Sequence, residues 1–185
     1  SDAAGVVVTH GTATLEETAY FLNLTVKSNK PVVVTGAMRP PSSLGTDADV
    51  NLIDAIKVAA APQSADRGVL TILNNQIQAA RDVTKTNSFR LETFQTSDFG
   101  FLGYADSDEE VVFYRRPDRA HTINAEFDIS NVEHIPRVDI PFAYAGADGV
   151  VIKALAEAGV DGLVCLLFTS PSPRDLPTSR MPSSA

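Results

Sequence analysis

The sequence predicts an α/β fold: a mostly parallel sheet flanked by helices, with a β-hairpin and the start of a second α/β domain. Three observations predict this fold. Short apolar runs of strand length alternate with stretches of helical periodicity in the first part of the chain. Two short β runs around a polar turn follow in its middle. Beyond a stretch without periodicity, the order of strand and then helix begins again.

The first strand, the first helix and the second strand form a predicted βαβ unit. Residues 6–8 and 32–34 are runs of β-branched valines, which are typical of buried parallel strands. Between them, one helical face carries four apolar residues: Leu15, Ala19, Leu22 and Val26. Thr14, followed three positions later by Glu17, predicts a capping box that opens this helix.

A second helix and a third strand continue the pattern. We expect Asp49 to be the N-cap of this helix. Its inward face is expected to carry Leu52, Ile53 and Ile56. Residues 69–73 then supply the next strand, so the sheet is expected to be largely parallel.

A hairpin and a linker follow the third strand. Residues 101–104 and 111–114 flank the polar residues 106–109, which predicts the β-hairpin. We expect residues 1–130 to form the first domain. Residues 131–137 lack periodicity and contain a proline, so they are the predicted linker.

Residues 138–164 are the predicted start of the second domain. Its first strand is expected at 138–144, and Asp148 is expected to cap a helix that stops before Gly159. Residues 162–167 can begin another strand.

The tail, residues 165–185, has a different composition. Its prolines are interleaved with serines and threonines, a composition that cannot supply a core helix or a central strand. We expect it to be irregular, and either disordered or artefactual.

The composition predicts a globular protein without nucleic acid or membrane partners. Apolar residues make up 44% of the 185 residues, which is enough for a core. The net charge of −8 disfavours binding to phosphate backbones or anionic lipid. Cys165 is the only cysteine, and the three histidines lack metal-ligand spacing, so no metal is predicted. Glycine-rich phosphate-binding patterns are absent, so no cofactor is predicted.

The residues with the clearest chemical signal follow the first strand. Gly11 permits a tight turn, and Thr12 is expected in the crevice at the carboxyl end of the strand, where α/β enzymes hold their sites. Residues 9–14, 31–40 and 81–87 resemble three successive motifs of the bacterial type II L-asparaginase family. The first reads Thr-His-Gly-Thr-Ala-Thr, the second ends in Thr-Gly-Ala-Met-Arg-Pro, and the third reads Arg-Asp-Val-Thr-Lys-Thr-Asn.

The resemblance implies an activity. Members of this family hydrolyse L-asparagine to L-aspartate and ammonia through a threonine-based mechanism without a cofactor. It implies a small-molecule substrate, L-asparagine or L-glutamine, and a homotetramer for the intact relatives. It also implies a periplasmic or secreted location.

The resemblance further implies roles for individual residues. Thr12 and Lys85 match the family's catalytic threonine and lysine, which act together to activate a hydroxyl or an attacking water. Gly11, Thr12 and Ala37 match substrate-binding positions, with the Ala37 carbonyl facing the substrate amide. Ala37 can equally be a packing residue at the end of a strand. Lys85 can act as a base only if its surroundings lower its pKa.

Two departures from the family pattern predict little or no turnover by this chain. The family's Thr-Gly-Gly-Thr-Ile-type segment, which carries the primary nucleophilic threonine, is expected ahead of residue 1, and most of the carboxyl-terminal domain is also expected to be missing. Ala13 stands where the family has an aspartate. Losing that carboxylate removes a charge-assisted hydrogen bond worth roughly 1.5 to 3 kcal/mol.

Two alternative functions fit the same residues. One is a non-catalytic module that binds an amino acid. The other is the asparaginase-like subunit of a tRNA-dependent amidotransferase, which shares the Thr-His-Gly-Thr element. The continuation Glu-Glu-Thr-Ala-Tyr-Phe-Leu at residues 16–22 favours the type II enzymes.

Overall fold

A computed structural model describes residues 2–106 and 110–167, without the side chain of Leu167. The chain divides into two compact units, Ser1–Ser130 and Asn131–Ala185. Residues 131–137 contain no helix or strand. No helix in the described residues is long and apolar enough to cross a membrane.

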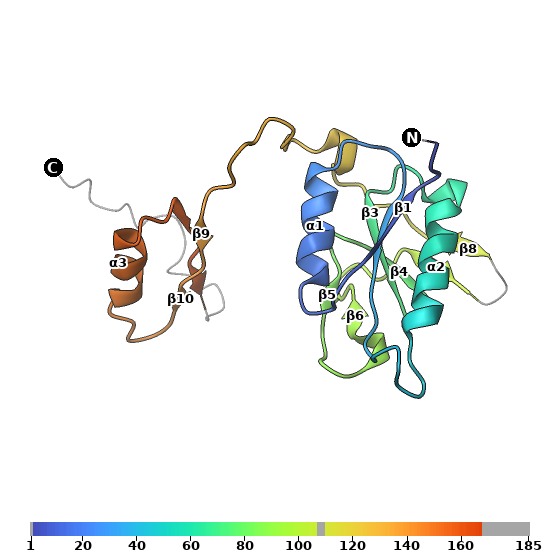
Figure 1. Cartoon of the computed structure of the whole chain (residues 1–185), viewed down its shortest axis with the longest axis horizontal. Helices are drawn as coiled ribbons and strands as arrows, with labels where there is room; N and C mark the ends of the chain where they lie inside the picture. Colours follow the sequence, from blue (N-terminus) through green and yellow to red (C-terminus); the bar gives the residue numbers. More distant parts are fainter. Residues whose placement is uncertain (1, 107–109, 168–185) are drawn as a thin grey trace. The chain divides into compact units, whose positions relative to one another are not determined.

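The first unit contains a six-stranded mixed sheet, so the predicted α/β fold is confirmed (Figure 1). Its order is β1-β2-β3-β4-β7-β8. Three strands are parallel: β1 (Val6–Thr9), β2 (Val32–Thr35) and β3 (Val69–Leu73). The other three add antiparallel pairings: β4 (Gln76–Ala79), β7 (Gly103–Ala105) and β8 (Val111–Phe113). The sheet is therefore mixed and not largely parallel as predicted, because the chain turns directly from β3 into β4 without a crossover helix. The β7–β8 pair is the predicted hairpin, whose turn at 107–109 lies outside the described residues.

Smaller elements complete the first unit. A separate antiparallel pair is formed by β5 (Thr84–Lys85) and β6 (Phe94–Gln95). Three short 3-10 helices lie at Pro62–Ser64, Leu91–Thr93 and Thr122–Asn124.

Helix α1 (Leu15–Thr25) packs as its periodicity predicts. Leu15 and Ala19 are fully buried, and Leu22 and Val26 pack against the same core cluster. Thr14 occupies the N-cap position, but its side chain makes no capping hydrogen bond, so the capping box is wrong.

Helix α2 (Ala48–Ala60) differs from its prediction in two ways. Its N-cap is Asp47, two residues before the predicted Asp49. The predicted inward residues are exposed: Leu52 by 39%, Ile53 by 53% and Ile56 by 54%. The buried face instead consists of Asn51, Asp54, Ala55, Val58 and Ala59. Asn51 and Asp54 can face inward because residues in neighbouring loops are their hydrogen-bond partners.

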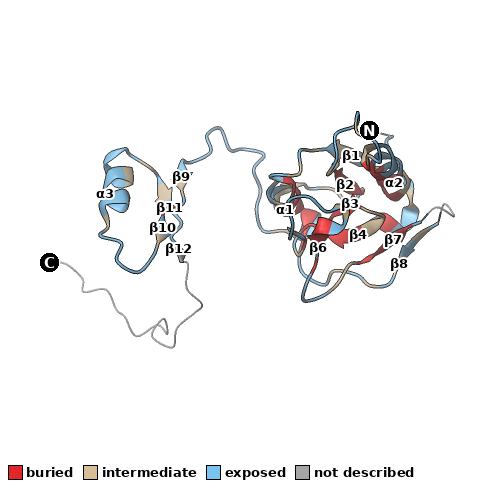
Figure 2. Cartoon of the chain, turned by 90° about the horizontal axis from the view of Figure 1, so that it is seen from below, coloured by how far each residue is buried: buried red, intermediate tan, exposed pale blue. Residues whose placement is uncertain are grey.

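The two helices pack against opposite faces of the sheet. Val33 belongs to the core cluster that contains the apolar residues of α2, whereas Val32 and Val34 belong to the cluster that contains Leu15 and Ala19. This alternation is expected because successive strand residues point to opposite faces. Figure 2 shows the buried residues gathered on these elements of the first unit.

The second unit contains short elements around one helix. Two parallel pairs form, β9 (Val138–Asp139) with β11 (Gly162–Leu163), and β10 (Phe142–Ala143) with β12 (Leu166–Leu167). The predicted strand at 138–144 is therefore two strands, interrupted at Pro141. The predicted irregular tail begins at residue 165, but Leu166 and Leu167 within it form β12, and residues 168–185 lie outside the described residues.

Helix α3 (Val150–Glu157) begins one residue after the position that was predicted from Asp148. Its N-cap is Gly149, which has a φ of 79°. Asp148 lies just before this residue, and its carboxylate accepts a hydrogen bond from the Val150 N–H at 3.1 Å. A glycine adopts this left-handed conformation without the steric cost that a side chain adds.

Candidate active site

The side chains of Thr12 and Lys85 meet in the first unit. Lys85 Nζ donates a hydrogen bond to Thr12 Oγ1 at 2.9 Å, although 73 residues separate them in the sequence. Both side chains are partly buried. A hydroxyl and an amine in contact can exchange a proton once the amine is neutral, which is the requirement for activating an oxygen nucleophile.

Thr12 is positioned by close contact between the ends of β1 and β2. His10 N donates to Thr35 O at 2.8 Å, just beyond the paired ends of these strands. Gly36 follows, and a Cβ built on it would lie 2.4 Å from His10 O and 3.3 Å from Thr12 Cγ2. A glycine is therefore required at position 36 for the Thr12 turn to pack against the second strand.

Lys85 is positioned by a residue that the sequence analysis did not identify. The carboxylate of Glu16, in the first turn of α1, accepts hydrogen bonds from the Lys85 backbone N–H and, at 3.2 Å, from Thr84 Oγ1. Backbone pairing of Lys85 with Phe94 holds the other side of the short strand β5. Glu16 therefore ties the strand that carries Lys85 to the helix that follows Thr12.

The loop around Ala37 is held by a buried polar network. The carboxylate of Asp47 accepts hydrogen bonds from the backbone N–H groups of Met38 and Arg39, both at 2.9 Å. Asn51 Nδ2 donates to Gly36 O and to Asp47 Oδ2, each at 2.9 Å. Asp47 is 8% exposed and Asn51 is 1% exposed. This network fixes the backbone on both sides of Ala37.

Asn51 also connects a third loop to this network. Its Oδ1 accepts a hydrogen bond from the Asn74 backbone N–H at 3.0 Å. Asn74 follows β3 and has a φ of 51°, in the left-handed region. The loops that follow β2 and β3 are thereby held at the same edge of the sheet, where a parallel α/β fold places its ligands.

Ala13, where the resemblance leads us to expect a carboxylate, brings none to the site. It lies in the exposed turn between Thr12 and α1. Within residues 2–106 and 110–167, no carboxylate forms an ion pair with Lys85. Among the described residues, the side-chain amine of Lys85 therefore has the Thr12 hydroxyl as its polar partner.

His10 and His121 make local contacts outside the Thr12 and Lys85 pair. His10 contacts the Gly11 carbonyl through Nδ1 at 2.8 Å and Thr18 Oγ1 through Nε2 at 2.9 Å, so its ring holds the turn against α1. His121 is buried, and burial lowers its pKa. Among the described residues, no group of three or more His, Cys, Asp or Glu side chains is arranged to hold a metal.

Comparison with known proteins decides the family. Residues 1–119 match the family described as Asparaginase, N-terminal. The chain belongs to the asparaginase family. The match includes all three motifs in which the resemblance was found, together with Thr12, Ala37 and Lys85.

Individual asparaginases are similar over most of the chain. The L-asparaginase 2 of Escherichia coli is 48% identical over 86% of this chain, and the probable periplasmic L-asparaginase of Haemophilus influenzae is 46% identical over 86%. The alignments cover 46% of each relative, so the chain spans less than half of their length. These relatives support the predicted type II resemblance.

A solved asparaginase structure shares the fold. The probable cytoplasmic L-asparaginase of Campylobacter jejuni superposes with a TM-score of 0.83 at 47% identity. The match covers 88% of this chain and 52% of that one.

Proposed function

We propose that this chain is part of an L-asparaginase-like amidohydrolase, which converts L-asparagine and water to L-aspartate and ammonia. The observation that carries the proposal is the 2.9 Å hydrogen bond between Lys85 Nζ and Thr12 Oγ1, within two motifs of the asparaginase family. L-glutamine is the second substrate that the proposal includes.

The proposed chemistry uses Thr12 and Lys85 together beside the substrate. Lys85 acts as the base and takes a proton from the Thr12 hydroxyl or from an attacking water while the oxygen attacks the side-chain amide carbon. The proton then passes to the leaving nitrogen as the carbon–nitrogen bond breaks, and ammonia departs. Where the Thr12 oxygen is the attacking group, a water then hydrolyses the ester that it forms, which releases L-aspartate and restores the Thr12 hydroxyl. The Ala37 carbonyl accepts a hydrogen bond from the substrate amide, and Gly11 leaves room for the substrate beside Thr12. No cofactor takes part.

We propose that the 185-residue chain itself has little or no activity. The Thr-Gly-Gly-Thr-Ile-type segment does not occur in its sequence, and Ala13 cannot pair with the substrate ammonium or with Lys85. The test is an ammonia-release assay on the parent protein with and without Ala13→Asp. We expect the Ala13→Asp protein to be about tenfold to hundredfold faster. Equal rates would contradict the role given to this position.

The proposal extends to the organisation of the parent protein. We assign residues 1–130 to the amino-terminal asparaginase domain, residues 131–137 to a linker and residues 138–164 to the start of the carboxyl-terminal domain. We also propose a homotetramer, which light scattering on the parent protein tests. A periplasmic or secreted location is supported by the periplasmic relative, whereas the similar solved structure is named cytoplasmic. Cell fractionation decides between the two.

Ala13 favours a second candidate, a module that binds an amino acid without turnover. The contact between Thr12 and Lys85 is kept in this chain, while the carboxylate of the family is lost. Calorimetry of the 185-residue chain with L-asparagine and L-aspartate tests this candidate. Saturable heat supports binding, and its absence removes the candidate.

A further inference from the structure

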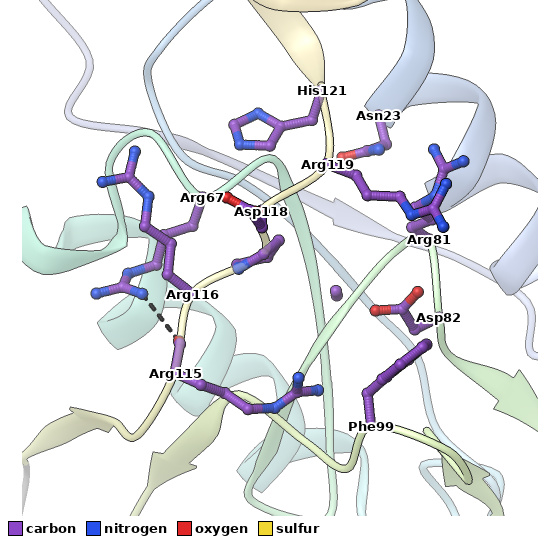
Figure 3. Close-up of a pocket in the computed structure, with 12 residues that line it drawn as sticks. Asn23, Arg67, Arg81, Asp82, Phe99, Arg115, Arg116, Asp118, Arg119 and His121 are labelled. Atoms are coloured by element: carbon purple, nitrogen blue, oxygen red, sulfur yellow. Dashed lines mark hydrogen bonds between the residues drawn. The ribbon is translucent and has the colours of Figure 1, made fainter.

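A cavity of about 310 Å³ lies in the first unit at a place that neither Thr12 nor Lys85 lines (Figure 3). Its walls carry five of the chain's 15 lysine and arginine residues, namely Arg67, Arg81, Arg115, Arg116 and Arg119. Two acidic residues, Asp82 and Asp118, line the same cavity. Positive charge is therefore concentrated here in a chain whose net charge is −8.

Three of these arginines build the walls. Arg67 Nη1 donates to the Arg115 carbonyl at 3.0 Å, and Arg115 Nε donates to the Phe101 carbonyl at 3.0 Å. Arg116 forms an ion pair with Asp66. These contacts join the segment after β8 to neighbouring loops, so the cavity has a defined shape before any ligand enters.

Arg81 and Arg119 are the two arginines of this cavity whose guanidinium N–H groups have no hydrogen-bond partner among the described residues. Within the described part of the chain, neither forms a hydrogen bond or an ion pair, and their guanidinium groups lie on the same side of the cavity (Figure 3). Both also line an adjoining cavity of about 340 Å³. Arg81 lies over the Tyr20 ring, 5.6 Å from its centre, which favours one placement of its guanidinium group.

Burial lowers the pKa of two groups that line the cavity, and the charge of Arg116 adds to this effect. The pKa of Arg67 is lowered by burial and then by the charge of Arg116. The pKa of His121 is lowered mainly by burial; Asp66 raises it, and Arg116 lowers it by a smaller amount. A bound anion opposes both effects of Arg116, so it raises these pKa values.

We propose that this cavity binds a small oxyanion, a carboxylate or a phosphate, between Arg81 and Arg119. The planar guanidinium group offers paired N–H donors that match two oxygens of either anion. Asp82 faces the same space and opposes negative charge in it (Figure 3). This site is independent of the proposed amidohydrolase activity, because it uses none of the residues of the Thr12 and Lys85 site.

The test is an NMR titration of the isotope-labelled 185-residue chain with inorganic phosphate and, separately, with acetate, at constant ionic strength. The arginine Nε–Hε and His121 resonances report binding. We expect a saturable shift and a higher His121 pKa in the bound state. The anion that binds more tightly identifies the ligand as phosphate or carboxylate.

Charge variants make the test specific. We expect Arg119→Gln and Arg81→Gln each to weaken binding about fivefold or more, and Asp82→Asn to strengthen it. Arg90→Gln is the control, because Arg90 is exposed and does not line the cavity. A shift that does not saturate, an equal loss in Arg90→Gln, or weaker binding by Asp82→Asn overturns the proposal.

Discussion

Glu16 accepts a hydrogen bond from the backbone N–H of Lys85, across 69 residues of sequence. The same carboxylate accepts a hydrogen bond from Thr84 Oγ1 at 3.2 Å. The position of Lys85 beside Thr12 therefore depends on a side chain from the first turn of α1. Within the described residues, this backbone hydrogen bond is the contact that Lys85 makes with an acidic side chain.

Glu16→Ala is expected to loosen β5. The substitution leaves the Lys85 N–H without its acceptor, so the free energy of unfolding falls by about 1–2 kcal/mol. The Lys85 amide is also expected to exchange its hydrogen faster than in the unaltered chain. Hydrogen exchange followed by NMR and urea unfolding measure the two effects.

Glu17→Ala is the matched control for this prediction. Glu17 lies in the same helical turn and is exposed. Its removal is expected to change the free energy of unfolding by less than about 0.5 kcal/mol. Equal exchange of the Lys85 amide in both variants would show that Glu16 does not anchor β5.

Asn51→Ala is expected to be among the more damaging substitutions in the first unit. Asn51 is 1% exposed and connects Gly36, Asp47 and Asn74. Its loss leaves buried polar groups without partners, so the free energy of unfolding falls by about 2–4 kcal/mol. Urea unfolding measures this change.

Asp49→Ala tests the correction to the start of α2. If Asp47 is the N-cap, the exposed Asp49 contributes only a favourable interaction with the helix dipole, about 0.5 kcal/mol. A loss above about 1 kcal/mol would support Asp49 as the cap instead. The two α2 variants can be compared in the same unfolding experiment.

The success of the α1 prediction and the error in α2 have one physical origin. The spacing of apolar residues predicts the buried face of a helix correctly when that face packs against apolar residues. It fails when the buried face carries polar residues that have hydrogen-bond partners. Leu15 and Ala19 meet the first condition because they pack against Val32, Val34 and Val69. In α2, Asn51 and Asp54 face inward because backbone and side-chain groups of distant loops satisfy them.

Some residues of the candidate site could be predicted from the sequence, and others could not. Thr12 and Lys85 belong to recognisable motifs, so the sequence predicted both. Glu16, Asp47 and Asn51 act through contacts with loops or strands folded against them, and their own spacing resembles ordinary helix starts. Contacts between segments that are far apart in the chain cannot be predicted from the local sequence pattern alone.

Stability is expected to fall as the pH falls through the unfolded-state pKa of histidine, about 6.5. Burial lowers the pKa of His121 in the folded chain, so below this pH the unfolded chain binds a proton that the folded chain resists. The loss is complete below the folded-state pKa. Urea unfolding between pH 7.5 and pH 5 measures this slope.

His121→Gln is expected to lose less stability over the same pH interval. The variant cannot take up the proton, whereas the other residues are the same in both proteins. An unchanged slope would show that His121 titrates alike in the folded and unfolded chains. The comparison concerns the slope alone, so any fixed cost of the substitution does not affect it.

Gly36→Ala is expected to destabilise the turn that holds Thr12. The added methyl group would lie 2.4 Å from the His10 carbonyl oxygen, which is backbone and can move only if β1 and β2 separate at their ends. We expect a loss of about 1–3 kcal/mol in the free energy of unfolding. Gly11→Ala is the control, because a Cβ at Gly11 meets no heavy atom within 4 Å. If both variants unfold at the same urea concentration, close packing of the two strand ends does not position Thr12.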